Sequence, residues 1–207
     1  PRAGLRCCGT CGIAVSQSPL LAMGDGALGL WAALDEVFPT TEHHRCWNHR
    51  VLNVQAKLPR RLQPEVRKRL REMAFAETQA ACEELRDDYV VDLRTAGQDS
   101  AAETVLRNWE EFVPFYHYPK EHWIHLRTTN PSESIFAGVR LRTDAAKRLR
   151  HRDNALYLVF KIVERLKGHW RTFNGGANLM ALVLAGCIFK DGLLQRQEVR
   201  QFATAVA

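Results

Sequence analysis

Apolar and polar positions divide this chain into a short α/β part and a longer helical part. The apolar run over 19–24 predicts a buried strand, and apolar residues then recur at helical spacing over 28–38. The same reasoning predicts a second strand over 42–47 and a second helix over 51–58. The first part of the chain is therefore predicted to be strand, helix, strand and helix.

The middle of the chain has a helical pattern. Arg, Glu, Ala and Leu dominate from residue 60 to about 107, with apolar residues on one helical face and charged residues on the other. An aromatic segment over 109–119 is interrupted by prolines, and we expect it to pack this helical part against the core. Trp109 and Trp123 are expected to be core residues rather than base-stacking platforms. We predict a mainly α-helical insertion over 51–121.

The last third of the chain is also predicted to be helical. Asn130 and Pro131 form a helix-start signal, with Asn as the cap and Pro in the first turn. Further helices are predicted over 153–171 and 179–189, separated by a Gly-Gly break, and the tail after Asp191 is predicted to fray. We assign 122–173 to a core helix segment and 174–207 to a C-terminal helix and tail.

The composition limits the classes of protein to which the chain can belong, but it does not indicate one function. The chain has 207 residues, 46% hydrophobic content and a formal net charge of +6, which suits a globular protein with an anionic partner. No run of 18 apolar residues occurs, so the sequence predicts no membrane span, and we expect a cytoplasmic protein. Six cysteines at irregular spacing predict reduced thiols, and a single Cys-x-x-Cys at 8–11 argues against a zinc ribbon.

Two acidic residues stand in settings that suit catalysis. Asp25 follows the first predicted strand and precedes Gly26, while Glu133 falls in the first turn of a predicted helix 108 residues later. Carboxylates at such places hold divalent metal ions for phosphodiester chemistry. The alternative for Asp25 is an ordinary Asp-Gly turn at a strand end. A two-metal site needs about three carboxylates or more, and no acidic residue precedes Asp25.

Several blocks in order resemble the Mutator-type transposases of bacterial insertion sequences. The resemblance runs from about residue 12 to 192. The blocks are Gly24-Asp-Gly-Ala-Leu-Gly-Leu-Trp-Ala-Ala-Leu, Val37-Phe-Pro, Arg45-Cys-Trp-Asn-His49, Pro119-Lys-Glu-His-Trp and Leu126-Arg-Thr-Thr-Asn-Pro-Ser-Glu-Ser-Ile-Phe.

The resemblance implies a fold and a reaction. It implies an α/β fold, a truncated ribonuclease-H-like core with a mainly α-helical insertion, and residues 12–50 would be part of that core. It also implies a DDE-type transposase that cuts and joins DNA with Mg²⁺ or Mn²⁺. Asp25 would be the second Asp of an Asp-Asp-Glu triad and Glu133 its Glu, both as catalytic residues and as metal ligands. The first Asp would lie upstream, so we expect these 207 residues alone to be inactive.

The family also carries a Cys-x-x-His signature, matched here by Cys46 and His49. Two such residues do not make a structural zinc site, and we expect no zinc. A Cys-His nucleophilic pair lacks an identifiable orienting group. We therefore favour a packing role for the pair, or positioning of DNA near the active site.

A basic stretch follows Glu133 and is the predicted DNA-binding surface. A charge run is usually a solvated face, and the place beside a candidate phosphodiester site makes phosphate binding an equal alternative. Arg127, together with Thr128 and Thr129, is predicted to orient a phosphate in the same way. The remaining predicted DNA-binding residues are Arg140, Arg142, Lys147, Arg148, Arg150 and Arg152.

Two other interpretations stay open. The chain could be a non-catalytic DNA-binding remnant that interferes with full-length transposase, or the product of a pseudogene that does not fold. DNA, including terminal repeats and target DNA, is the expected partner in each case where the chain folds. The resemblance implies a bacterial, nucleoid-associated protein and leaves room for a homo-oligomer.

The first eleven residues do not match the family, and we interpret 1–11 as an out-of-frame segment. Arg6-Cys-Cys-Gly-Thr-Cys-Gly can be encoded by CGC TGC TGC GGG ACC TGC GGG. Read from the last base of the Arg codon, this DNA gives Leu-Leu-Arg-Asp-Leu-Arg, which suits an amphipathic helix. Sequencing the genomic DNA is expected to show those codons, and any codons that do not give this second reading contradict the hypothesis.

Overall fold

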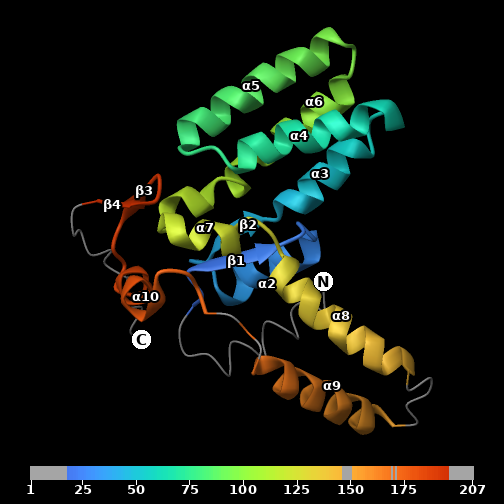
Figure 1. The fold of residues 1–207 in the computed structure, drawn as a ribbon, viewed down its shortest axis with the longest axis vertical. Helices are drawn as coiled ribbons and strands as arrows, with labels where there is room; N and C mark the ends of the chain where they lie inside the picture. Colours follow the sequence, from blue (N-terminus) through green and yellow to red (C-terminus); the bar gives the residue numbers. More distant parts are fainter. Residues whose placement is uncertain (1–17, 146–150, 169, 171, 196–207) are drawn as a thin grey trace.

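The computed structural model describes residues 18–145, 151–168, 170 and 172–195, and Figure 1 shows their arrangement. The described chain is mostly helical and contains two small sheets. The predicted mixed fold, helical in most of its length, is therefore confirmed at this level. The interpretation of 1–11 lies outside the described residues.

The first sheet consists of two parallel strands. β1 (Leu21–Gly24) pairs with β2 (Glu42–Arg45), so that Leu21 faces Glu42 and Gly24 faces Arg45. Helix α2 (Leu28–Val37) connects them, as parallel strands require. β2 ends two residues earlier than predicted because Cys46 already caps the next helix, α3 (Trp47–Gln55). The strand, helix, strand and helix order is confirmed.

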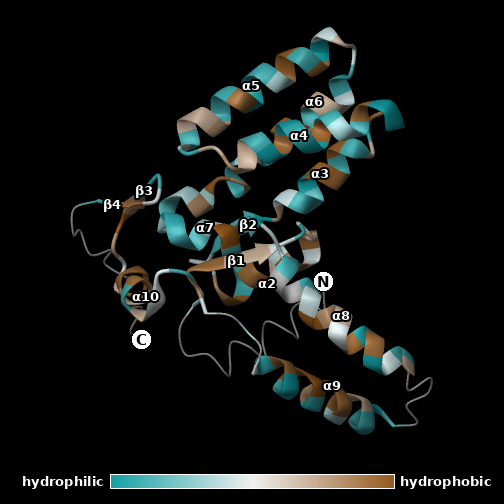
Figure 2. Cartoon of the chain, viewed as in Figure 1, coloured by the Kyte–Doolittle hydropathy of each residue, from teal (hydrophilic) through white to brown (hydrophobic). Residues whose placement is uncertain are grey.

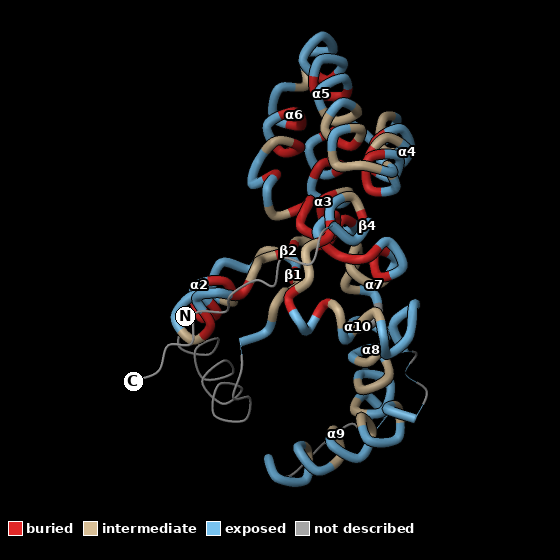
Figure 3. The backbone as a smooth tube through the Cα atoms, turned by 90° about the vertical axis from the view of Figure 1, so that its left-hand side faces the viewer, coloured by how far each residue is buried: buried red, intermediate tan, exposed pale blue. Residues whose placement is uncertain are grey.

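The two faces of this sheet are covered by different helices (Figure 3). α2 covers one face, where Trp31 stacks on His43 of β2 with ring centroids 4.4 Å apart. α7 (Trp123–Leu126) and α10 (Gly176–Leu184) lie on the other side, and α10 packs against Leu20 and Leu21. The two strands and their carboxyl ends are thus held between helices from distant parts of the sequence.

Among the described residues, the helical insertion builds the largest hydrophobic core. The residues of this core run from Trp47 of α3 to Trp123. Both Trp109 and Trp123 are buried, which confirms their predicted core role. Its further elements are η1 (Arg60–Leu62), α4 (Gln63–Ala74), α5 (Gln79–Thr95), α6 (Asp99–Leu106), η2 (Trp109–Glu111), η3 (Pro114–His117) and η4 (Lys120–His122).

Arg50 joins α3 to the far end of the insertion. Its guanidinium is buried, donates hydrogen bonds to the carbonyl oxygens of Thr104 and Arg107, and lies 3.8 Å from the ring centroid of Phe112. The two carbonyls belong to the last turn of α6 and to the residue that caps it, where backbone acceptors lack helical partners. Burial lowers the pKa of Arg50 to about 9. Arg50 therefore stabilises the end of α6 while it holds α3 in place.

Helices α8 (Asn130–Ala145) and α9 (Arg152–Lys167) pack against each other and extend away from the insertion (Figures 1 and 3). Both confirm predicted helices, but Asn130, which was predicted to cap the first of them, already lies within α8, and the carbonyl oxygen of Thr129 before it accepts the hydrogen bond of the Glu133 N–H. Apolar residues run along both helices in Figure 2, and none of the described α9 side chains is fully buried. Large exposed apolar side chains on this pair are Phe136, Leu141, Leu156, Tyr157 and Phe160.

The C-terminal part corrects two predictions. The last helix, α10, ends at Leu184 rather than at residue 189, because Gly186 has a positive φ of 79° and Phe189 enters a strand. The segment after Asp191 is not frayed as far as Gln195. Asp191 and Gly192, both at positive φ, turn β3 (Phe189–Lys190) back onto β4 (Leu193–Leu194). Asp-Gly is the residue pair that such two-residue hairpin turns favour.

His44 gives this core a predicted dependence on pH. The ring is fully buried in β2, makes an edge contact with Phe115, and burial lowers its pKa to about 4. The unfolded chain binds a proton near pH 6.5, where the folded chain does not. The unfolding free energy should therefore fall as pH drops from 6.5 to 4, by up to about 3 kcal/mol.

Urea denaturation of the wild type and of His44→Leu at several pH values measures this effect. The variant should lose most of the slope and keep the smaller contributions of other groups, such as His122, whose pKa is also lowered by burial. Equal slopes in the two proteins between pH 6.5 and 4 would contradict the assignment to His44.

Candidate active site

Asp25 lies at the carboxyl end of β1, where its side chain is exposed. One carboxylate oxygen, Oδ1, accepts a hydrogen bond of 3.0 Å from the backbone N–H of Ala27, and Gly26 between them has a φ of 93°. Asp25 therefore does form the Asp-Gly turn that the sequence offered as the simpler interpretation. The same turn presents the carboxylate to solvent at the strand edge, so the two interpretations are compatible.

The side chain of Arg45 packs against this turn. Its guanidinium lies against Gly26 so closely that a Cβ at Gly26 would come within 2.1 Å of Nη2. The side chain donates to the carbonyl oxygen of Asp25 at 3.5 Å and forms an ion pair with Glu111 of η2 at 3.5 Å. The last residue of β2 thus links the turn at Asp25 to the insertion.

Glu133 lies in the first turn of α8, as predicted, and is exposed. Its backbone N–H donates to the carbonyl oxygen of Thr129 at 3.0 Å, and its side-chain Oε1 accepts a hydrogen bond from the Thr129 hydroxyl. An acidic group is favoured at a helix start by the helix dipole. Residues close in sequence therefore determine the position of Glu133 at the helix start and one hydrogen bond of its carboxylate.

Cys46 connects the two carboxylate-bearing segments. Its backbone N–H donates to the carbonyl oxygen of Gly24 at 2.9 Å, next to Asp25. Its Sγ lies 3.3 Å from both the backbone nitrogen and the hydroxyl oxygen of Thr129, which in turn contacts Glu133. Residues 108 positions apart in the sequence are therefore brought to the same edge of the sheet.

Two further contacts hold the segment from the end of α7 to the start of α8 against α3. The backbone N–H of Trp47 donates to the carbonyl oxygen of Arg127 at 3.0 Å. The side-chain amide of Asn48 donates to Oδ1 of Asn130 at 2.8 Å. Sequence reasoning did not identify Asn48 or Arg45 as site residues, although both lie in the block Arg45-Cys-Trp-Asn-His49, which was the signal that could have found them.

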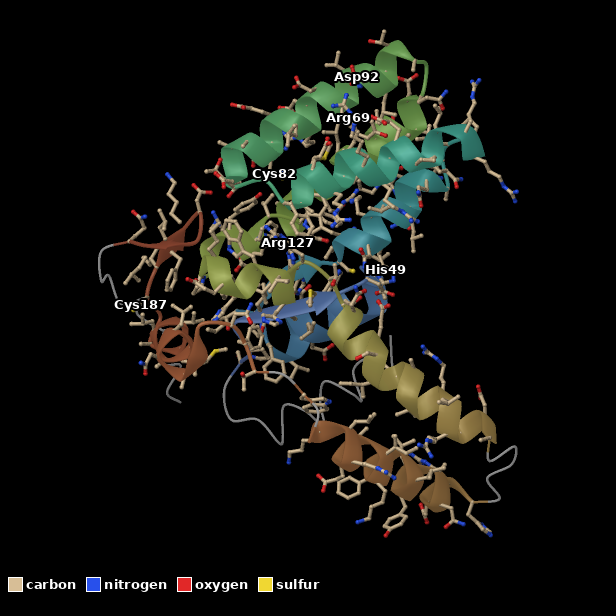
Figure 4. The ribbon with its side chains drawn as sticks, viewed as in Figure 1. His49, Arg69, Cys82, Asp92, Arg127 and Cys187 are labelled. Atoms are coloured by element: carbon tan, nitrogen blue, oxygen red, sulfur yellow. The ribbon has the colours of Figure 1, made fainter. Side chains whose placement is uncertain are left out.

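His49 is on α3, one turn after Cys46, near the carboxyl edge of the sheet (Figure 4). Its Nδ1 is buried and makes no hydrogen bond within the described chain. Among the described residues no group of three or more His, Cys, Asp or Glu side chains is arranged to hold a metal ion. The metal-ligand roles of Asp25 and Glu133 and the role of His49 therefore stay predictions.

Arg127 has a different environment from the other predicted DNA-binding residues. Its guanidinium lies 4.4 to 5.4 Å from the ring centroids of Phe75, Phe115 and Trp123, and burial lowers its pKa. Figure 4 shows it at the joint between the insertion and the sheet. It also lines an open groove of about 350 Å³ with Lys120.

The described part of the basic stretch lies on the α8–α9 pair. Arg140, Arg142 and Arg152 are exposed there. Lys147, Arg148 and Arg150 lie outside the described residues, so their positions stay predictions. Exposed guanidinium groups beyond Glu133 are suited to phosphate contacts, which carry affinity but no sequence information.

Comparison with known sequences identifies the family. The profile of the family described as "Transposase, Mutator family" matches residues 15–172, which include Asp25, the insertion and Glu133. The chain therefore belongs to the Mutator family of transposases.

Individual relatives agree with this assignment. The chain is 41% identical over 184 residues to the transposase for insertion sequence element IS6120 of Mycolicibacterium smegmatis, covering 86% of this chain and 55% of the relative. It is 38% identical over 179 residues to the transposase for IST2 of Acidithiobacillus ferrooxidans, covering 86% of this chain and 60% of the relative. This chain thus spans somewhat more than half the length of these relatives.

None of the helices in the described part of the chain is long and apolar enough to cross a membrane. The cysteines among the described residues, Cys46, Cys82 and Cys187, are free thiols.

Gly26→Ala tests how tightly the turn after Asp25 is built. The substitution forces a residue with a Cβ to adopt a φ of 93° and pushes that Cβ into the Arg45 guanidinium. We expect a loss of about 3 kcal/mol in the unfolding free energy, measured by urea denaturation.

Gly97→Ala is the matched control, because Gly97 also has a positive φ of 69° but no atom lies within 4 Å of its added Cβ. Gly97→Ala should lower the unfolding free energy by only about 1 to 2 kcal/mol, which is the cost of the left-handed backbone conformation for a residue with a Cβ. Equal losses for the two variants would mean that Arg45 does not restrict the turn.

Proposed function

We propose that this chain is part of the catalytic region of a DDE-type transposase that cuts and joins DNA at the ends of an insertion sequence. The observation that carries the proposal is the single contact path from Gly24 through Cys46 and Thr129 to Glu133. This path supports the proposal that the carboxylates of Asp25 and Glu133 belong to the same site. The family and the two relatives named as insertion-sequence transposases support the same reaction.

The donor chemistry suits Mg²⁺ or Mn²⁺. Both carboxylates are exposed oxygen ligands at the end of a strand and the start of a helix, and hard divalent cations prefer such ligands and keep waters. When bound, the metal supplies charge stabilisation for the attacking and leaving oxygens of a phosphodiester displacement. In this proposal Asp25 and Glu133 hold the metal, and the backbone contacts of Cys46 and Trp47 fix the two segments that carry them.

The fold proposal is that β1, β2 and α2 are part of a ribonuclease-H-like sheet. Parallel pairing and the position of Asp25 at the carboxyl edge support this. In open α/β sheets this edge is where ligands bind. The insertion between β2 and α8 then corresponds to a helical domain that separates the second and third members of the triad.

DNA is the proposed partner, and α8 and α9 are its proposed contact. Arg140, Arg142 and Arg152 are exposed on the helix pair that carries Glu133 in its first turn. DNA whose phosphates bind to these arginines would have its backbone directed toward the carboxylates of Asp25 and Glu133. The net charge of +6 supports this partner.

We further propose that the 207 residues alone have little catalytic activity. No acidic residue precedes Asp25 in the sequence, so the first carboxylate of the triad has no candidate before the second. Alignment of the reacting groups supplies much of the rate of phosphoryl transfer, and two carboxylates align a metal less well than three.

Metal titration tests the proposed site. Addition of Mn²⁺ to the ¹⁵N-labelled chain is expected to broaden amide signals around residues 24–27 and 129–134 by paramagnetic relaxation. Asp25→Asn and Glu133→Gln should each weaken the binding about tenfold or more, because each removes one charged ligand.

Glu84→Gln is the control, because Glu84 is an exposed carboxylate on α5, outside the site. It should leave the titration unchanged. Broadening that is insensitive to Glu133→Gln would contradict the proposed site. Mg²⁺-dependent DNA strand transfer by the isolated chain, lost in Glu133→Gln, would contradict the proposed inactivity.

A further inference from the structure

We propose that Cys46 is a positioning residue for Glu133 and acts through the hydroxyl of Thr129. The inference rests on the proposed function, because it explains how one carboxylate is aimed relative to the other. It also assigns a role to the cysteine of the Cys-x-x-His pair, which the catalytic proposal leaves unexplained.

The contacts define a short chain of polar groups. Sγ of Cys46 lies 3.3 Å from Oγ1 of Thr129, and Oγ1 of Thr129 lies within hydrogen-bond distance of Oε1 of Glu133. The backbone N–H of Thr129 also donates to Sγ at 3.3 Å. Cys46 is completely buried, whereas Glu133 is exposed. This row of polar groups therefore runs from the interior to the surface of the protein.

Counting hydrogens gives the direction of these bonds. A threonine hydroxyl has one hydrogen, and an ionised carboxylate can only accept. The Thr129 hydroxyl therefore donates to Glu133, because the bond to a charged acceptor is the stronger one. The oxygen of that hydroxyl is then free to accept, and the thiol hydrogen of Cys46 is the donor that faces it. The order is Cys46 S–H to Thr129 O–H to Glu133.

The same cysteine is also fixed relative to Asp25. Its backbone N–H donates to the carbonyl oxygen of Gly24, the residue before Asp25. The backbone of Cys46 thus belongs to the strand edge that carries one carboxylate, and its side chain contacts the helix start that carries the other. A change at Sγ would alter the direction of Glu133 while Asp25 stays in place.

A purely structural role is the alternative, because buried cysteines commonly behave as small apolar residues. The chain contains a matched example. Cys82 of α5 is also completely buried, lies in the core of the insertion, and burial raises its pKa to about 12. The two residues share burial, but only Cys46 contacts a residue that contacts Glu133.

The experiment uses the whole 207-residue chain and the ¹³Cδ chemical shift of the Glu133 carboxylate at pH 8 without metal. Cys46→Ala and Thr129→Val should both move this shift, because each interrupts the chain of hydrogen bonds. Cys46→Ser and Thr129→Ser keep a donor and should stay near the wild-type value. Cys82→Ala should leave the shift unchanged, although it removes an equally buried thiol.

Metal affinity gives the second readout. Cys46→Ala and Thr129→Val are expected to weaken Mn²⁺ binding about fivefold, the effect of one lost hydrogen bond of about 1 kcal/mol. Cys46→Ser should recover most of this loss. Circular dichroism and a thermal melt check the fold of each variant, and Cys46→Val fills the space if Cys46→Ala does not fold.

The outcomes separate the two proposals. If Cys46→Ala or Cys46→Val leaves the Glu133 shift at the wild-type value, Cys46 only packs and the inference is wrong. An unchanged shift in Thr129→Val overturns it as well. If Glu133→Gln does not weaken Mn²⁺ binding, the proposed function fails, while the metal-free shift still decides whether Cys46 positions Glu133.

Discussion

The hydrogen bond from the backbone N–H of Trp47 to the carbonyl oxygen of Arg127 is the constraint on which the rest of the structure depends. It joins two residues 80 positions apart, so the insertion leaves the sheet and returns to it at one place. Closing a flexible loop of this length costs about 4 kcal/mol. That cost is offset by an aromatic core that includes Trp47, Phe112, Phe115, Tyr116 and Trp123.

The candidate site therefore depends on the folding of the insertion, although neither Asp25 nor Glu133 belongs to it. The charged groups at the joint show why. Arg45 contacts the turn at Asp25 and pairs with Glu111 of the insertion, while Arg127 inserts its guanidinium among the rings just before the start of α8. Arg50 holds the outer part of the same core through two backbone carbonyls. Buried and partly buried cations, held by rings and carbonyl oxygens, support the two segments of the candidate site without contacting either carboxylate.

Local signals explain what could be predicted from the sequence. An apolar run ending in Asp-Gly predicted β1 and the turn at Asp25, and Asn130-Pro131 predicted the helix that carries Glu133, because strand patterning and helix capping act over a few residues. The contact between Cys46 and Thr129 spans 83 residues and involves no charge, so no pattern in the sequence indicates it. The predicted helix to residue 189 was wrong for a related reason. Strands of two residues are too short to show the alternation of apolar and polar residues, and the apolar sequence of α10 continues up to them.

The small β3–β4 hairpin has a consequence for the order in which the chain matures. Asp191 accepts a hydrogen bond from the backbone N–H of Gln79, and Gly192 pairs with the backbone of Tyr116 and Lys120 beside the ring of Trp123. On a ribosome, residues 189–194 emerge about 4 to 14 seconds after Trp123. The hairpin contacts with Gln79, Tyr116 and Lys120 can therefore form only after the whole insertion has been synthesised. The last residues of the described chain thus complete the surface of an insertion that is translated before them.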